Sequence, residues 1–367
     1  MREMKNSGIE WLGDIPCDWE LSQIKSVYTE RKTKVSDKDY PPLSVTMKGI
    51  VPQLATAAKS DAHDDRKLVL KGDFAINSRS DRRGSCGISQ YDGSVSLINT
   101  ILCPREQSDA KYYDWLFHTT MFADEFYKWG HGIVDDLWTT NWQDMKRISI
   151  PVPTMSEQKK IADFLDEKCA EIDTVIEKTK ATIEEYKKLK QSVITQAVTK
   201  GIRPNRPMKD SGIEWIGEIP EKFNVVSLKY LCSMQAGKTL NSEQILPNGL
   251  YKVYGGNGER GYFNEFNNEG VYLLVGRQGA LCGNVHRVSG KFWATEHAVV
   301  TTPSKYADIN YLFYLLIAMN LNQYASNTAA QPGLSVNVII NKKCTLPNIN
   351  EQMEIADYLD KKCYEID

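Results

Sequence analysis

The chain has 367 residues, of which 41% are hydrophobic and 25% are charged, values typical of folded globular domains. Its formal net charge of −2 gives no overall sign of nucleic-acid binding, although a local basic face is compatible with it. No apolar run approaches the roughly 18 residues of a membrane span, and the opening MREMKNSGIE lacks the hydrophobic core of a signal peptide. We therefore predict a cytoplasmic protein, with no membrane partner, that is long enough for two domains.

A phrase near the start of the chain occurs twice. KNSGIEWLGDIP at 5–16 returns as KDSGIEWIGEIP at 209–220, with nine of twelve positions identical. A second phrase, PTMSEQKKIADFLDEKCAEID at 153–173, returns at 347–367 with thirteen of twenty-one positions identical. A period this long indicates a duplicated domain rather than a solenoid. The similar ends and divergent middles predict one frame that presents two different surfaces.

The middle of each copy contains short strands followed by a helix. β-Branched and apolar residues are broken by Gly, Asp and Pro in the strand regions, and aromatic and aliphatic residues follow a helical spacing in the helix. In the first copy, 68–78 and 87–104 are predicted to be short strands and turns, and 145–153 a last strand. In the second copy the predicted strands are 251–255, 271–276 and 292–302, and the predicted helices of the two copies are 111–130 and 309–325.

Residues 156–200 predict one long helix, because no Gly or Pro occurs from the N-cap candidate Ser156 to Gly201. At 1.5 Å per residue it would be about 66 Å long. Its apolar residues recur in steps of mostly three and four, which predicts a coiled coil. A surface helix packed along one domain is the alternative, but an average domain is too short to cover it. The predicted coiled-coil positions are Ile161, Leu165, Ile172, Val175, Ile183, Tyr186, Leu189 and Val193.

The expected fold class is α/β (α+β), with an internal pseudo-two-fold repeat. Two similar globular domains are joined by long helices that form a coiled coil. The predicted boundaries are 1–155 for the first domain, 156–200 for the long helix, 201–349 for the second domain and 350–367 for the start of a second helix, which continues for only about five turns.

Several patterns typical of enzymes fail on their context. GGNGERG at 255–261 contains GxGxxG, and AGKT at 236–239 resembles the end of a phosphate-binding loop, but neither opens a helix. The five histidines form no HExxH motif, and the eight cysteines form no CxxC pair. We predict free buried thiols, no metal site and no catalytic residue in this chain.

Two polar loops remain as candidate recognition sites. Arginine makes a bidentate hydrogen bond to guanine, and Asn and Gln carboxamides pair with adenine. Hydroxyls and backbone amides bind phosphate, so loops of this composition suit DNA binding. Solvated turns whose arginines serve solubility are the alternative. The candidate residues are Asn77, Ser78, Arg79, Arg82, Arg83 and Gly84 in the first copy and Asn257, Arg277, Gln278 and Gly279 in the second.

Together these features resemble the specificity subunit of type I restriction–modification systems. The resemblance rests on the SGIEWLGDIP-like phrases, the PxxxEQxxIAxxLD helix openings and a GRQGALCG…WATEHAVV core at 276–300. It implies that each domain is a target-recognition domain that reads one half of a split DNA sequence. The implied partners are double-stranded DNA, two adenine methyltransferase subunits docked on the helices, and restriction motor-nuclease subunits. No cofactor would bind this chain, since S-adenosylmethionine, ATP and Mg belong to the partner subunits.

Two features of the chain keep alternatives open. The second long helix is nearly absent, so the first could pair with a second copy of this chain or with a methyltransferase subunit. We also expect Ile9 and Trp11, with Ile213 and Trp215 in the second copy, to dock each domain against the helices, unless each phrase is only a capped turn in its own domain. A coiled-coil assembly protein that does not bind DNA is the alternative function.

Overall fold

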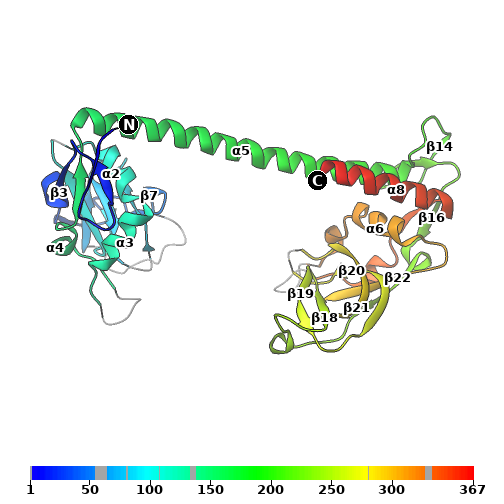
Figure 1. Ribbon diagram of the computed structural model, residues 1–367. Helices are drawn as coiled ribbons and strands as arrows, with labels where there is room; N and C mark the ends of the chain where they lie inside the picture. The colour runs from blue at the N-terminus through cyan, green and yellow to red at the C-terminus, as the bar shows by residue number, and fades with distance from the viewer. Residues whose placement is uncertain are drawn as a thin grey trace. The chain divides into compact units, whose positions relative to one another are not determined.

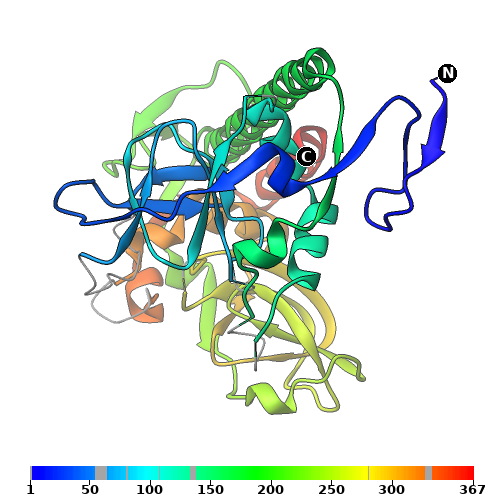
Figure 2. The same cartoon turned by 90° about the vertical axis from the view of Figure 1, so that its left-hand side faces the viewer.

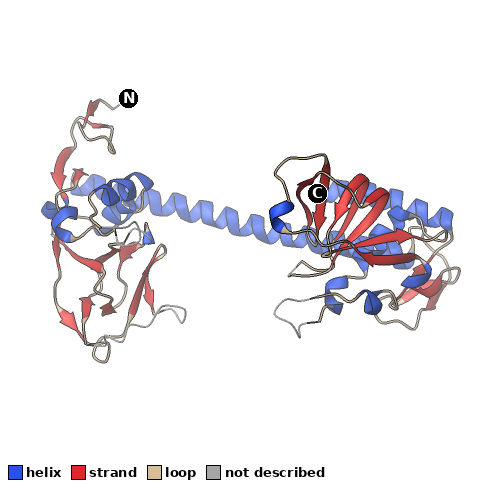
Figure 3. Cartoon of the chain, turned by 90° about the horizontal axis from the view of Figure 1, so that it is seen from below, coloured by secondary structure: helices blue, strands red, loops and turns tan. Residues whose placement is uncertain are grey.

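The computed structural model describes residues 2–53, 64–79, 82–106, 108–132, 138–279, 281–326 and 333–367. They form two compact units, Met1–Ile176 and Glu177–Asp367. Helix α5 (Met155–Lys200) begins in the first unit, ends in the second and is unbroken (Figure 3). Among the described residues, no helix has both the length and the hydropathy of a membrane span.

The first unit is built from small antiparallel sheets. The strand orders are β10-β9-β12-β4, β11-β8-β5, β13-β3, β6-β7 and β1-β2. The elements are β1 (Met4–Asn6), β2 (Asp14–Pro16), β3 (Glu20–Gln23), α1 (Ile24–Val27), β4 (Tyr28–Glu30), β5 (Lys34–Val35), β6 (Leu43–Thr46), β7 (Gly49–Pro52), β8 (Arg66–Val69), β9 (Phe74–Asn77), β10 (Cys86–Ile88), β11 (Gly93–Val95), β12 (Asn99–Pro104), α2 (Ala110–Phe117), α3 (Thr120–Lys128), α4 (Trp142–Met145) and β13 (Ser149–Val152).

An aromatic cluster fills the core of the first unit. Phe117 of α2 stacks on Phe122 of α3 at 4.4 Å between ring centroids and meets Phe74 of β9 edge-on at 5.2 Å. Tyr28 of β4 completes the cluster and is fully buried. Each such buried ring stabilises the fold by roughly 1.5–3 kcal/mol relative to an exposed one. This cluster fixes α2 and α3 against the sheet that carries the first candidate loop.

The second unit is organised by one six-stranded sheet with the order β17-β22-β20-β21-β18-β19. All its pairs are antiparallel except β18 with β21, which is parallel. Helix α6 packs between this sheet and α8 (Figure 1). The elements are β14 (Met208–Asp210), β15 (Glu218–Pro220), β16 (Asn224–Ser227), β17 (Cys232–Ala236), β18 (Tyr251–Gly255), β19 (Gly258–Phe263), β20 (Asn268–Gly276), β21 (Val285–Ala294), β22 (Ala298–Pro303), α6 (Ile309–Ala318), α7 (Val336–Ile339), β23 (Lys343–Leu346) and α8 (Ile349–Ile366).

The mixed α/β fold, the two similar modules and the long helix are confirmed, but two predicted helices are too long. The segment 111–130 is two helices, because Thr119 is extended and caps α3 by accepting from Phe122 N through its hydroxyl. The segment 309–325 stops being α-helical after Ala318, because Asn320 adopts a left-handed φ of 43° before a short 3-10 turn. Neither break carries the Gly or Pro that marks such ends in a sequence.

A buried glutamine locks the start of each repeated helix. In the first unit, Gln158 Nε2 donates to Pro153 O at 2.8 Å, and its Oε1 accepts from Asp109 N at 2.9 Å. Asp109 in turn caps α2, since its carboxylate accepts from Tyr112 N. Gln158 is 1% exposed, so these bonds are made away from water. The lock therefore joins the end of β13, the start of α5 and the start of α2.

The second unit repeats this lock with a bond added. Gln352 Nε2 donates to Pro347 O and to Tyr306 O, both at 3.0 Å, and its Oε1 accepts from Asp308 N at 2.8 Å. Asp308 caps α6 as Asp109 caps α2. The glutamine of the repeated PxxxEQ phrase thus has the same structural task in both units.

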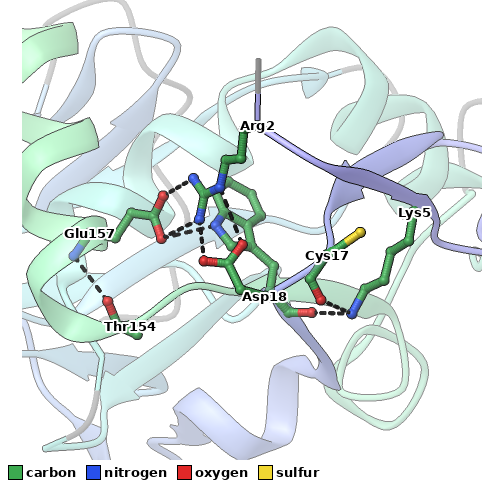
Figure 4. A network of polar contacts seen from close by, with 7 residues as sticks. Arg2, Lys5, Cys17, Asp18, Thr154 and Glu157 are labelled. Atoms are coloured by element: carbon green, nitrogen blue, oxygen red, sulfur yellow. Dashed lines mark hydrogen bonds and ion pairs between the residues drawn. The ribbon is translucent and has the colours of Figure 1, made fainter.

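The glutamate beside each glutamine joins the helix to the residues that open its own module. Figure 4 shows the Arg2 guanidinium between the carboxylates of Glu157 and Asp18, and Arg2 Nη2 lies 2.6 Å from Asp18 Oδ2. Trp19 Nε1 also donates to Glu157 Oε2, at 3.0 Å. Hydrogen bonding from Arg2 is the largest cause that lowers the pKa of Glu157. We call this arginine–aromatic–glutamate contact the clamp.

The second clamp is more buried. Arg206 Nη1 lies 2.6 Å from Glu351 Oε1, and the guanidinium stacks over Phe223 at 5.6 Å. The side chains are only 17% and 6% exposed, against 44% and 23% for Arg2 and Glu157. Each module is therefore closed by a contact between its first residues and its helix.

The phrase that opens each module is a small hairpin. β1 pairs with β2 and β14 with β15, and in Figure 2 the first hairpin (blue) stands at the margin of its unit. The turn requires glycine at Gly8 and Gly212, whose φ values are 71° and 70°. Asn6 Oδ1 and Asp210 Oδ1 accept from the N–H groups of these glycines at 2.8 and 2.9 Å.

The tryptophans and isoleucines of these phrases meet the buried clusters. Trp11 is 7% exposed, packs edge-on against Phe122 and, with the partly buried Ile9, joins the cluster that contains Ala162 of α5. Ile213 and Trp215 are partly buried against the cluster that contains the end of α5 and the face of α8. Their predicted role in docking each domain on the helices stays a prediction.

Candidate nucleic-acid interface

The two candidate loops lie at the same position in the two modules. After β9, Arg79 forms a β-bridge with Thr139, and Thr140 N donates to Ser78 O at 3.0 Å. After β20, Gln278 forms a β-bridge with Gly333, and Leu334 N donates to Arg277 O at 2.8 Å. In both units the residue that bridges to the loop also forms a second β-bridge with a residue that precedes it in the chain: Thr139 with His131, and Gly333 with Ser326.

This backbone frame makes Ser78 equivalent to Arg277 and Arg79 equivalent to Gln278. A short helix follows the bridged segment in each unit, α4 in the first and α7 in the second. The segments at 131–139 and 326–333 share no sequence phrase, so the repeats in the sequence did not reveal the frame. The frame fixes where a loop lies and leaves its side chains free to differ.

In the first loop, two candidate residues are buried and hold the backbone. Asn77 and Ser78 are each 7% exposed. Asn77 Oδ1 accepts from Arg79 N at 3.1 Å, and Ser78 Oγ lies 3.0 Å from Thr100 Oγ1. Their side chains face their own domain, and this leaves the arginines as the groups presented outward. Gly84 turns the chain with a φ of 71°.

The arginines of this loop are anchored on α3. Arg83 forms an ion pair with Asp124 and stacks over the Tyr127 ring at 5.6 Å. Tyr127 Oη donates to Arg79 O at 3.0 Å, so α3 also fixes the loop backbone. Arg82 and Arg83 are exposed, and Arg79 is half-buried. A guanidinium held by a ring and a carboxylate loses less conformational freedom when it binds a base or a phosphate.

His118, at the end of α2, links that helix to β10, the strand that follows the loop. His118 Nε2 lies 3.6 Å from Cys86 Sγ, and Nδ1 lies 2.8 Å from Asp114 O and 3.4 Å from its carboxylate. Hydrogen bonding to Asp114, then to Cys86, raises the pKa of His118 to about 11. Burial raises the pKa of Cys86, so this thiol is a poor nucleophile. We read the group as structural.

In the second unit, Arg277 and Gln278 are exposed and lie between two adjoining hollows. One hollow, of about 410 Å³, is lined by Arg277, Gln278, Ser335 and Asn337 among others. The other, of about 380 Å³, is lined by Asn257, Glu259, Arg260, Gln278 and His297. Gln278 lines both hollows.

A third hollow continues this surface across the sheet. It has a volume of about 310 Å³ and shares Ala236 with the first. Its polar lining residues are Ser233, Gln235, Lys238, Asn267, Asn268, Tyr272 and Thr302. We call the three adjoining hollows the polar band. Arg260, Arg277 and Lys238 give it positive charge, while Glu259 is neutralised by Lys252 at 2.8 Å. The band is therefore locally cationic on a chain of net charge −2.

Glycines bring the backbones of this band close together. A Cβ on Gly276 would lie 2.0 Å from Gly256 O, so only glycine fits there. Asn257, in the same turn, accepts from Asn284 Nδ2 at 3.0 Å. Gly279 turns the loop with a φ of 91°. These contacts hold the loop at the end of β20 close to the hairpin of β18 and β19.

The structure also explains the rejected enzyme patterns. GGNGERG is the turn of the β18–β19 hairpin, with no helix after it. Gly237 of AGKT is packed against β21, where a Cβ would lie 2.2 Å from Ala294 O. Within the described parts of the chain, no three metal-ligating side chains gather in one place.

The apolar stripe of α5 is exposed between its two ends. Ile161 and Val193 pack against the cores of their own units, and Leu165 is partly buried. The other predicted coiled-coil positions are exposed by 48–63%: Ile172, Val175, Ile183, Tyr186 and Leu189. Pairing of this stripe in a coiled coil stays a prediction.

A duplicated module that holds two different polar loops on one frame defines a two-part recognition scaffold. Comparison with known proteins gives it a family. The model of the type I restriction modification DNA specificity domain matches residues 16–185 and 220–366. The chain belongs to this family, whose known role is recognition of a DNA target and whose members are generally non-catalytic. The family implies a complex with methyltransferase and motor-nuclease subunits and DNA.

Two curated relatives carry the same description. The type I restriction enzyme EcoprrI specificity subunit of Escherichia coli is 46% identical over 139 residues, which are 37% of this chain and 34% of that protein. The MjaVIII specificity subunit of Methanocaldococcus jannaschii is 24% identical over 384 aligned residues, which cover 94% of this chain and 86% of that protein. The chain thus matches about a third of the first relative and most of the second.

Two solved structures share the fold. One, from a study of assembly and conformational transition of the type I R-M system, has a TM-score of 0.71 at 13% identity and covers 96% of this chain and 92% of its own. The HsdS subunit of Thermoanaerobacter tengcongensis has a TM-score of 0.51 at 14% identity, with 96% and 90% covered.

Proposed function

We propose that each unit of this chain reads one half of a split DNA sequence. The observation that carries the proposal is the shared frame: the same β-bridge and backbone hydrogen bond hold Ser78 and Arg79 in one unit and Arg277 and Gln278 in the other. A frame that stays constant while its polar side chains change is what two different half-sites require. Arginine and carboxamide side chains supply the donors that read guanine and adenine in the major groove.

The chain supplies recognition, and its partners supply the chemistry. S-Adenosylmethionine belongs to two adenine methyltransferase subunits, and ATP and Mg belong to the motor-nuclease subunits. The non-catalytic character of the family supports this division. The exposed apolar stripe of α5 supports a docking role for the helices, either for the methyltransferase subunits or for a second copy of this chain.

The test is selection from random duplex DNA with this chain copurified with its methyltransferase. A split motif with two fixed halves and a constant gap is expected. Replacing Arg79, Arg82 and Arg83 by Ala should relax only one half, with a loss of roughly 1–3 kcal/mol for each bidentate base contact removed. Replacing Gln278 by Ala should relax only the other half. Arg105→Ala, an exposed arginine outside the loop, is the matched control.

A protein-assembly scaffold is the second candidate function, and the exposed stripe on α5 favours it. The two candidates differ in their response to salt. Binding through phosphate contacts falls steeply as salt is added, whereas association through apolar side chains does not. If this chain forms a complex with its methyltransferase at all salt concentrations but enriches no DNA sequence, the DNA-reading function is overturned and the assembly function is supported.

A further inference from the structure

Asn337 presents an unused carboxamide beside the second candidate loop. Asn337 lies in α7, four residues after Gly333, which forms the β-bridge with Gln278. The residue is exposed. Its side chain makes no hydrogen bond to any residue that the structure describes, since the bond from Asn341 Nδ2 at 2.8 Å goes to its backbone carbonyl. It lines the same 410 Å³ hollow as Arg277 and Gln278.

The backbone around Asn337 is fixed at both ends. On one side Leu334 is 3% exposed and donates to Arg277 O at 2.8 Å. On the other side Ile339 is fully buried, and Ile340 O accepts from Lys229 N at 2.8 Å. The carboxamide therefore projects from a rigid support at a fixed place relative to the loop. Reading a base by hydrogen bonds requires this kind of support.

The first unit has a carboxamide at the equivalent position. Gln143 lies in α4, four residues after the bridged Thr139, as Asn337 lies four residues after Gly333. Its backbone N–H donates to the Asn141 cap at 2.8 Å, and the residue is exposed. Its Oε1 accepts from Lys146 Nζ with one lone pair, which leaves the second lone pair and the Nε2 donors for a base. Both short helices thus offer the same chemical group from the same point of the frame.

We propose that Asn337, and Gln143 in the first unit, are second specificity-determining residues that contact a base next to the one met by the bridged loop. An exposed carboxamide that pairs with adenine N6 and N7 is the contact that this group makes best in the major groove. The inference rests on the proposed function, because it assigns residues to the same DNA-reading surface. Arg277, Gln278 and Asn337 then read from the walls of one hollow.

The test uses the full chain with its methyltransferase, in the same selection from random duplex DNA. Asn337→Ala should make one position of the second half-site degenerate, leave the first half-site unchanged, and weaken binding to the wild-type target about 5- to 150-fold, the equivalent of one good base contact. Asn337→Asp, which keeps the shape but loses the amide donors, should do the same. Val338→Ala, at an exposed position of the same short helix, should leave the motif and the affinity unchanged.

Three outcomes would overturn the inference, and they are distinguishable. If both Asn337 variants select the full wild-type motif, Asn337 reads no base while the proposed function stands. If they weaken all DNA equally, Asn337 contacts phosphate. If the wild-type complex enriches no split motif, the proposed function itself fails and this inference with it. Circular dichroism of each variant shows whether it is folded, and Gln143→Ala repeats the test in the other half-site.

Discussion

The buried glutamine of the second lock should be among the most costly residues to remove from this protein. Gln352→Ala deletes three hydrogen bonds, to Pro347 O, Tyr306 O and Asp308 N, around a side chain that is 0% exposed. At about 1 kcal/mol of net stability for each bond, the loss is about 3 kcal/mol, and it grows where a buried partner stays unpaired. Gln352→Glu should cost at least as much, because a carboxylate oxygen would then face two carbonyl oxygens.

Denaturant midpoints measure this loss, and pulse proteolysis with fragment identification assigns it to a unit. We expect the second unit to unfold at a lower urea concentration while the first keeps its midpoint. Gln323→Ala is the matched control, since the side-chain bond of this exposed glutamine goes to Met319 O, four residues away, and its loss should change stability by less than about 0.5 kcal/mol. If Gln352→Ala behaves like this control, the lock does not hold α6 and α8 together and our account of the repeated glutamine is wrong.

Three further predictions use features of one unit at a time. Arg206→Ala should cost about 3–5 kcal/mol, because it leaves the buried Glu351 without its ionic partner, whereas Arg2→Ala at the exposed clamp should cost much less. Urea unfolding of both variants compares the two losses. Folding raises the pKa of His118, so its charge stabilises the first unit fully below pH 6.5 and progressively less as the pH rises toward 11. The difference in free energy of unfolding between wild type and His118→Gln should therefore decrease as the pH of the unfolding measurement is raised. Four residues inserted in the exposed part of α5 add about 6 Å of helix, so the recognised spacer should grow by about two base pairs with both half-sites unchanged, and an unchanged spacer in the selection would show that the helix does not set it.

The parts of the fold that the sequence predicted are those with long or repeated patterns. The helix of residues 155–200 could be found because no Gly or Pro interrupts it and its apolar residues recur in steps of mostly three and four. The breaks at Thr119 and Asn320 could not, since each depends on a single residue's backbone angle or cap.

The candidate site was predictable only in part. Arginine and carboxamide side chains after a strand indicated where recognition lies, but burial of Asn77 and Ser78 depends on Thr100 and neighbouring strands that only the fold brings near. The bridges to Thr139 and Gly333 pair residues more than fifty positions apart in segments without a shared phrase. The sequence did not indicate Asn337 and Gln143 as site residues, because they follow these same segments, which share no phrase.

The clamps have a consequence for how such a protein can change over evolutionary time. Each module is closed by residues at its two extremities, as Arg2 meets Glu157 and Arg206 meets Glu351. The two candidate recognition loops lie between those closures. A genetic exchange whose crossover points fall inside the two repeated phrases would transplant a whole reading surface and keep the arginine–glutamate pair, because the arginine precedes the first phrase and both copies of the second phrase carry the glutamate. New specificities could then arise by reassortment in one step, without the slow repair of a damaged core.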